Sequence, residues 1–136
     1  MAGTVITTAV VTIGGVDLSS YVQSVEISES FDELDTTTMA SGGRRERVAG
    51  LGDGQATFNF FNEWGGTGPD ATIAPLVGTV AAVTVKPASG AIAATNPEYQ
   101  FSVLVKEWTT GLTVGELSMA SVTWSISGAV TKDITP

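Results

Sequence analysis

The chain has 136 residues, a length that suits one domain, and its 6 Lys and Arg residues against 14 Asp and Glu residues give a formal net charge of −8. It contains no Cys and no His, which excludes disulfide scaffolds, Cys/His zinc sites, thiol nucleophiles and histidine-dependent triads. The negative charge also disfavours ordinary nucleic-acid binding, because such binding relies on cationic side chains that displace phosphate counterions.

No targeting segment is expected. Residues 1–5 lack the basic n-region of a signal peptide. The weakly polar run over residues 73–85 is interrupted by Pro75, Gly78 and two threonines, and it is too short for the roughly 20 apolar residues that span a bilayer. We therefore expect a chain that is made in a cytoplasm and stays soluble there, with no membrane insertion.

Apolar and polar residues alternate with a period of two along most of the chain, which is typical of half-buried strands. The alternation predicts strands over residues 5–13, 21–30, 55–62, 80–86, 99–108 and 117–127. Gly14 and Gly15 supply the positive-φ residues of a tight turn after the first strand. A short helix is expected after Asp70 as its N-cap, limited to one or two turns by Pro75 and ended by Gly78. The predicted fold is all-β, an antiparallel β-sandwich or squashed barrel with one short helix, in a single domain over residues 1–136.

Residues 31–54 break this alternation and are long for a connection in a compact domain. If the segment folds back about Ser41, residues whose numbers add to 82 face each other. The facing pairs are then Leu34 with Val48, Asp35 with Arg47, Thr38 with Arg44, and Phe31 with Leu51. Two apolar pairs and one pair of opposite charge in a single register predict a protruding β-hairpin arm.

The arm carries two groups of charged side chains. Its acidic residues are Asp32, Glu33 and Asp35, and its basic residues are Arg44, Arg45 and Arg47. A hard cation or an acid/base pair on the acidic group is the alternative interpretation, but no further oxygen ligands at a suitable spacing accompany it. We expect these charges to be solvated or to form ion pairs with a neighbouring subunit.

Two other features resemble sites without the residues that a site needs. Residues 50–54, Gly-Leu-Gly-Asp-Gly, look like a phosphate-binding loop but open a strand rather than a helix, so we interpret them as a flexible base for the arm. Trp124 has the inward parity of its strand, whereas Trp64 and Trp108 lie at strand ends, where an interface role is expected. We predict no catalytic, cofactor or metal site.

The order of these features resembles that of the tail tube (major tail) proteins of long-tailed bacteriophages over nearly the whole chain. The resemblance rests on residues 17–25 (DLSSYVQSV), the polar arm with Asp35-Thr36-Thr37, residues 50–54 before the strand over 55–62, and the short helix. It continues through residues 96–101 (NPEYQF) and through Val114-Gly115-Glu116, which lead into a last strand that ends at Gly128.

The resemblance implies a β-sandwich flanked by a helix that assembles into hexameric rings. In such proteins each subunit adds one sheet to a continuous inner barrel, and rings stack around a tape measure protein in a tube through which DNA later passes without specific binding. Tail terminator and distal tail proteins would stand at the two ends. The arm would be mobile in the monomer and order on the adjacent ring. The chain would then belong to the virion tail and be assembled in the host bacterial cytoplasm, without a cofactor.

The same resemblance implies that a polar face of the sheet lines the channel. We expect this face to carry five short, non-basic side chains: Ser24, Glu26, Ser28, Thr57 and Asn59. An acidic or neutral wall repels phosphate and offers few of the Lys and Arg contacts that make DNA bind.

Two other classes of function share part of the pattern. A capsid decoration or adhesin-type β-sandwich module would share the Thr-rich strands and acidic surface, but it has no need for a long amphiphilic arm. An enzyme would have to be a carboxylate-only glycosidase, which needs two converging acids in a groove, whereas the acidic cluster here lies on the arm. We therefore expect a structural protein and not an enzyme.

Overall fold

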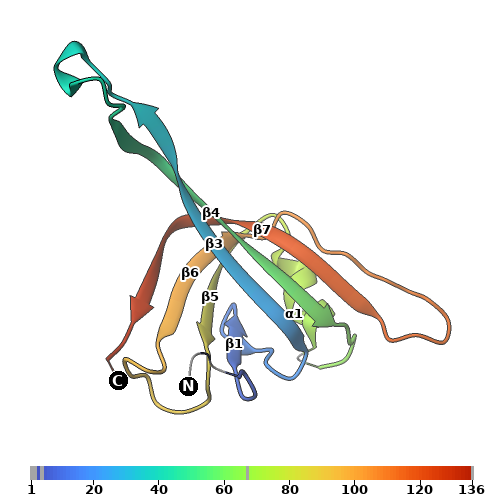
Figure 1. The fold of residues 1–136 in the computed structure, drawn as a ribbon. Coiled ribbons are helices and arrows are strands. Elements are labelled where there is room, and N and C mark those ends of the chain that lie inside the picture. Colours follow the sequence, from blue (N-terminus) through green and yellow to red (C-terminus); the bar gives the residue numbers. More distant parts are fainter. Residues whose placement is uncertain (1–2, 4, 67, 136) are drawn as a thin grey trace.

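The computed structural model describes residues 3, 5–66 and 68–135; residues 1, 2, 4, 67 and 136, which the predicted domain includes, lie outside this description. The described residues form seven strands in one antiparallel sheet, in the order β2-β1-β5-β6-β7-β4-β3 (Figure 1). The strands are β1 (Val10–Ile13), β2 (Val16–Asp17), β3 (Val22–Asp35), β4 (Arg47–Phe61), β5 (Val80–Lys86), β6 (Glu98–Leu104) and β7 (Met119–Asp133). The all-β prediction is confirmed.

The core lies on the concave side of this sheet. Alternate residues of β1, β4, β5, β6 and β7 point inward, and Trp124, Phe58 and Phe60 are the largest side chains that are fully buried. Phe58 stacks on Phe60 with ring centroids 5.7 Å apart and lies 5.3 Å from the Trp124 ring. The edge strand β3 also turns Val25 and Ile27 toward this core. The two layers of the predicted sandwich are therefore the two halves of one curled sheet.

The first strand is shorter than predicted. It begins at Val10 rather than Val5, and Val5 and Ile6 are exposed. β1 pairs with β5 only from Val10, which faces Lys86, the last residue of β5. Pro87 follows and has no amide hydrogen to extend the ladder. The predicted turn is present, since Gly14 and Gly15 have φ of 60° and 84°.

The strand predicted over residues 99–108 is likewise shorter at its end, because β6 stops at Leu104 and the amide of Val105 bonds the carbonyl of Thr79 at 2.9 Å. The last strand is longer than predicted, because β7 continues past Gly128 to Asp133. Gly128 has a φ of 90°, and the β6–β7 register shifts between Gln100 and Ser102. The glycine accommodates this irregularity, so the strand bends and continues instead of ending.

A short helical segment covers one end of the core. Helix α1 (Pro69–Ile73) is followed by the 3-10 turn η2 (Ala74–Leu76), which agrees with the predicted one or two turns. The predicted N-cap is wrong: Gly68 holds that position. Asp70 instead accepts a hydrogen bond from the indole of Trp108 at 3.0 Å. Trp108 also packs edge-on against Phe60, so it joins the helix to the core.

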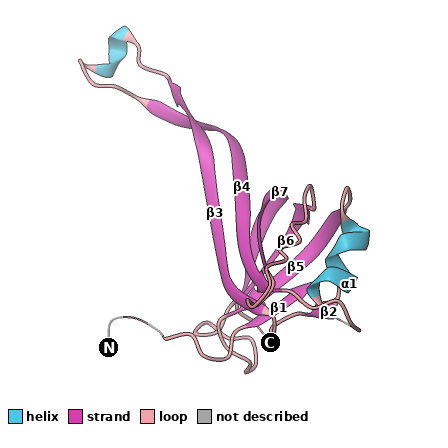
Figure 2. Cartoon of the chain, turned by 90° about the vertical axis from the view of Figure 1, so that its right-hand side faces the viewer, coloured by secondary structure: helices cyan, strands magenta, loops and turns pink. Residues whose placement is uncertain are grey.

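The predicted arm is present as the distal part of the β3–β4 hairpin, which projects from the sheet (Figures 1 and 2). Leu34 faces Val48 and Asp35 faces Arg47, as predicted. The predicted Phe31–Leu51 pair is wrong, because a bulge between Phe31 and Glu33 shifts the register and places Phe31 opposite Gly52. The predicted Thr38–Arg44 pair is also absent from the described ladder, since the chain turns there through a 3-10 turn, η1 (Met39–Ser41).

The different burial of Trp124 and Trp64 predicts that their replacement affects stability unequally. Replacing Trp124 by Phe removes ring volume and the 2.8 Å hydrogen bond from the indole to the carbonyl of Glu107. We expect the free energy of unfolding to fall by about 2 kcal/mol. The matched control is Trp64→Phe, because Trp64 is 49% exposed; its effect should stay within about 0.5 kcal/mol. Urea unfolding followed by far-ultraviolet circular dichroism measures both, and equal losses would contradict the assignment of Trp124 to the core.

Candidate functional site

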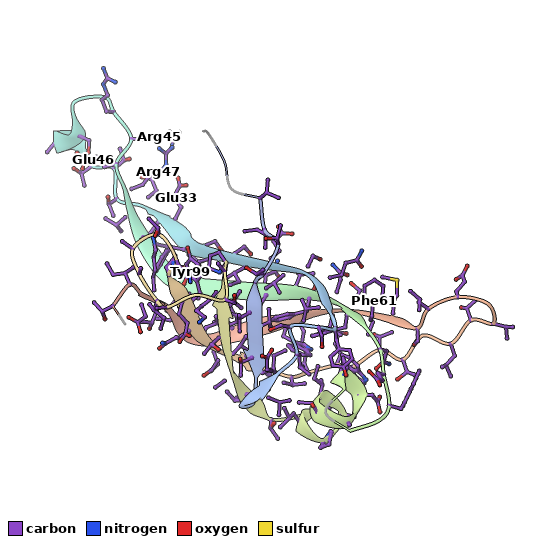
Figure 3. All side chains as sticks on the ribbon, turned by 90° about the horizontal axis from the view of Figure 1, so that it is seen from below. Glu33, Arg45, Glu46, Arg47, Phe61 and Tyr99 are labelled. Atoms are coloured by element: carbon purple, nitrogen blue, oxygen red, sulfur yellow. The ribbon has the colours of Figure 1, made fainter. Side chains whose placement is uncertain are left out.

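The charged residues of the arm form ion pairs with each other. Arg45 lies 3.3 Å from the carboxylate of Asp35, and Arg47 pairs with Glu33 (Figure 3). The predicted partner of Arg47 was Asp35, which is its neighbour in register but not its ionic partner. Both observed pairs join residues diagonally across the hairpin, as expected for long side chains on a strongly twisted two-stranded ribbon. All four side chains are exposed, so the pairs contribute little to stability.

Hydrogen bonds organise the tip of the arm. The amide of Thr37 donates to Asp35 Oδ1 at 2.8 Å, and the hydroxyl of Thr37 accepts the amide of Glu46 at 2.8 Å. The bonds that Thr37 donates, assisted by Arg45, hold the pKa of Asp35 below its usual value. Asp32 and Arg44 lie on the same arm without an ion pair among the described residues.

Residues 50–54 are not a flexible base. They lie inside β4, where residues 52–54 pair with β3 and Gly50 falls in the register shift, and Gly52 and Gly54 continue the inward row of Ala56, Phe58 and Phe60. A Cβ on Gly52 would stand 2.6 Å from the ring of Phe31. A Cβ on Gly50 would stand 3.2 Å from Leu34 Cγ. The glycines therefore let side chains of β3 lie flat across β4, which is the reason for this motif.

The arm exposes apolar side chains that have no place in the core of their own chain. They are Phe31, Leu34, Met39, Val48 and Leu51, and Met39 at the tip is fully exposed. Apolar residues gathered on a protrusion are typical of an interaction surface.

A polar face covers the outer side of β3, β4 and β7. The five residues predicted to line a channel, Ser24, Glu26, Ser28, Thr57 and Asn59, share this face. The register places Ser24 beside Asn59 and Glu26 beside Thr57, and Asn59 Nδ2 donates to Ser24 Oγ at 2.6 Å. The face is thus a layer of hydroxyl and amide groups.

The sequence prediction missed the share of β7 in this face. β7 pairs with β4, so Ser121 faces Asn59 and Thr123 faces Thr57, with the two threonine hydroxyls 3.1 Å apart. The alternation of small polar residues in β7 was visible in the sequence. That they extend this particular face depends on the strand order.

A second surface lies at the 105–118 loop. A hollow of about 460 Å³ there is lined by Asn62, Trp64, Leu112, Thr113, Val114, Glu116, Leu117 and Ser118. The amide of Asn62 bonds the carbonyl of Ser118 at 2.8 Å, and Ser118 Oγ donates to the carbonyl of Gly111. The loop is therefore tied to the end of β4. Trp64 was expected at an interface; the loop itself was not predicted as a site.

Asn62 is unusual within this hollow. Its side-chain nitrogen and oxygen are both buried, and neither has a hydrogen-bond partner among the described residues. A buried amide in this state costs about 1–3 kcal/mol, so it marks a place where the isolated chain is not fully satisfied.

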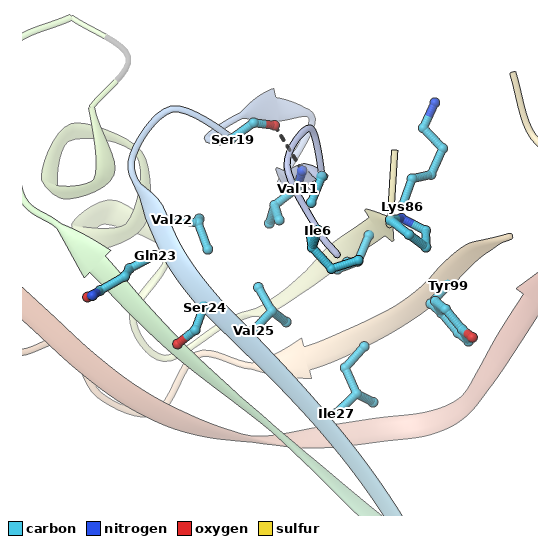
Figure 4. A pocket seen from close by; sticks show the side chains of 13 residues that line it. Ile6, Val11, Ser19, Val22, Gln23, Ser24, Val25, Ile27, Lys86 and Tyr99 are labelled. Carbon is cyan, nitrogen blue, oxygen red and sulfur yellow. Dashed lines mark hydrogen bonds between the residues drawn. The ribbon is translucent and has the colours of Figure 1, made fainter. Parts of the chain in front are cut away.

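A further apolar hollow, of about 300 Å³, lies between β3 and the opposite half of the sheet (Figure 4). Val22, Val25 and Ile27 line it from β3, and Tyr99 lines it from β6. Ser19 closes one side by accepting the amide of Val11 at 2.9 Å. The hollow thus lies beside the core, between the edge strand β3 and the strands opposite it.

The part of the chain that the structure describes holds neither a metal-binding cluster nor a membrane-spanning helix. No group of three or more Asp, Glu, His and Cys side chains in that part of the chain has the geometry to hold a metal ion. No helix there is long and apolar enough to cross a membrane.

The sequence matches no protein-family model and no curated protein. Solved structures do share its fold. A chain in the virion of a native gene transfer agent particle is similar with a TM-score of 0.63 and 15% identity, over 82% of this chain and 84% of that chain. A chain in the tail of an empty gene transfer agent particle, described with C6 symmetry, gives 0.59 and 17%, over 82% and 81%.

A third similar structure comes from the sixfold-symmetrised baseplate of the anti-feeding prophage. Its TM-score is 0.59 with 9% identity, over 98% of each chain. At these identities the likeness shows the fold. The resemblance to phage tail proteins predicted from the sequence is therefore confirmed at the level of the fold.

The lowered pKa of Asp35 predicts how pH affects the arm tip. A carboxyl group with a depressed pKa stabilises its structure above its unfolded pKa, ordinarily 3.8, and loses this effect as pH falls through the lower folded value. We expect the amide of Thr37 to exchange with solvent faster as pH falls below about 4, after correction for intrinsic exchange. In Asp35→Asn this pH dependence should disappear. Equal protection of Thr37 at pH 6 and pH 2.5 would contradict the prediction.

Proposed function

We propose that the chain is the tube-forming structural protein of a phage-type tail, a subunit that self-assembles into hexameric rings that stack around a central channel. The observation that carries the proposal is the shared fold with a chain in a tail of C6 symmetry, over 82% of this chain. The arm with its unpartnered apolar side chains adds a means of contact between copies.

The free edge of the sheet supports ring formation. β3 forms one edge, and its outer backbone groups have no strand partner among the described residues. A neighbouring subunit that continued the sheet would satisfy this edge, which a monomer leaves open to aggregation. If β3, β4, β7 and β6 face the channel in every subunit, a hexamer forms a barrel of about 24 strands, above the 16–18 strands at which an aqueous channel opens.

The polar face suits the wall of such a channel. Among the five residues assigned to the lumen, Glu26 is the charged one, and it repels phosphate, while the hydroxyl and amide groups offer no cationic contact. DNA would then pass without specific binding, after a tape measure protein has left the lumen. Terminator and distal tail proteins would close the two ends. In this proposal the protein is part of the virion tail, is assembled in the host bacterial cytoplasm and is not an enzyme.

Negative-stain electron microscopy over a concentration series tests the function itself. Hollow tubes or stacked rings with a central pore are the expected result. A monomer that binds capsids at regular positions instead would favour a decoration module and contradict the tube.

The arm predicts the effect of a deletion. Removing residues 36–45 takes away the end of the arm, which contributes no residue to the core cluster, so the monomer should keep its unfolding midpoint and its circular dichroism spectrum. We expect the variant to lose polymerisation under conditions in which the wild type forms tubes, because the arm reaches the adjacent ring. The control is an Arg45→Lys variant, which keeps the length and charge of the tip and should polymerise. Tubes of normal length from the deletion variant would refute this role.

The lumen assignment predicts where two side chains lie in the assembled tube. Glu26 and Asn59 should both line the channel in a helical reconstruction, because they share the polar face with β7. Finding both on the outer surface or inside a subunit would show that another face forms the wall.

A further inference from the structure

We propose that the arm tip of one copy docks into the hollow of the 105–118 loop of a second copy. This inference rests on the proposed function, in which the arm reaches another ring, and it names the surface that receives it. The tip is defined as residues 36–47, and the hollow is the one lined by Asn62, Trp64 and residues 112–118.

The two surfaces are matched in their apolar side chains. Met39 at the tip is 103% exposed, and Val114 on the loop is 102% exposed. Leu112 and Leu117 flank Val114 at 76% and 75% exposed. The isolated chain gives these side chains no partner, and contact between the tip and the loop would bury both sets together.

Their charges are complementary as well. The tip carries three arginines and one glutamate. Arg45 and Arg47 are paired with Asp35 and Glu33 of the same arm, which leaves Arg44 as its arginine without an ion pair among the described residues. Residues 62–70 and 105–118 carry Glu63, Asp70, Glu107 and Glu116 against Lys106, a net charge of −3. No ion pair involves Arg44 or Glu116 within the described residues, so these two remain available to each other. Opposite charges on two surfaces favour their encounter and fix their orientation.

The buried amide of Asn62 gives an independent sign that the hollow receives a partner. Both of its polar atoms lack hydrogen-bond partners in the described chain, yet the residue lines the hollow. The tip ends in a tight turn with Gly42 and Gly43 at φ of 66° and 76°, and the backbone of such a turn offers both donors and acceptors. Both polar atoms are buried in the isolated chain, so an inserted turn would satisfy the amide once the side chain rotates toward the hollow.

The placement of the two surfaces excludes a contact within one chain. Figures 1 and 3 show the arm and the 105–118 loop extending from opposite ends of the sheet. Each copy therefore has one docking surface and one receiving surface. A head-to-tail contact of this kind either closes a ring or continues along an assembly.

The chain has no cysteine, so disulfide trapping has a clean background. A tagged Met39→Cys variant is mixed with an untagged Val114→Cys variant at an assembling concentration and oxidised. We expect a mixed disulfide dimer on a non-reducing gel. The control partner is Ser89→Cys, an exposed residue of the β5–β6 connection, which should give less than a tenth of that product.

A charge exchange tests the same contact without a covalent bond. Arg44→Glu and Glu116→Arg should each raise the concentration needed for assembly at least tenfold, and the double variant should restore it toward the wild-type value. Both residues are exposed, so circular dichroism should show all three variants folded.

The outcomes separate this inference from the proposed function. Hollow tubes without the mixed disulfide, and with both single variants assembling normally, would overturn the docking site and leave the tube in place. A mixed disulfide in filaments without a pore would support the docking site and contradict the tube. If the protein gave neither assembly nor a mixed disulfide at any concentration, that result would overturn the docking site.

Discussion

The inward face of β4 loses side-chain volume step by step, from Phe60 and Phe58 through Ala56 to Gly54 and Gly52. Its large end packs beside Trp124, and pairing with β7 ends at Gln55. Beyond that point β4 has no side chain to bury, so the hydrophobic force that holds a sheet on its core is absent. The ladder with β3 continues because Phe31 and Leu34 lie across the glycines. The arm projects because of this change along one strand.

The same strand separates two surfaces of different chemistry. Its inward residues build the core and end in Gly54 and Gly52, while its outward residues Thr57 and Asn59 join a layer of hydroxyl and amide groups with β3 and β7. A face of this kind is costly to bury but inert toward phosphate. In the proposed tube the protrusion would contact other copies, and the polar face would form the wall of the channel.

The described part of the isolated chain has three features that lack a partner, and they lie on separate surfaces of the fold. The free edge of β3, the apolar arm tip and the hollow with the buried amide of Asn62 lie in different places on one fold. In a monomer each would be a liability for stability or solubility. In the proposed assembly each faces another copy, so that the subunit is complete only among its neighbours.

Period-two alternation was sufficient to predict the strand over 80–86 and the core position of Trp124, and folding the arm back about Ser41 was sufficient to predict the register of Leu34 with Val48, because these depend on residues near in sequence or on inward parity. The bulge that places Phe31 over Gly52 was not predictable, since it depends on how two side chains pack. The share of β7 in the polar face and the hollow around Asn62 were also missed, because sequence spacing does not reveal which distant strands pair. The sequence by itself determined an all-β chain with a charged, amphiphilic arm. Only the tertiary structure decided which residues share a face and which stay without a partner, because both follow from long-range strand order.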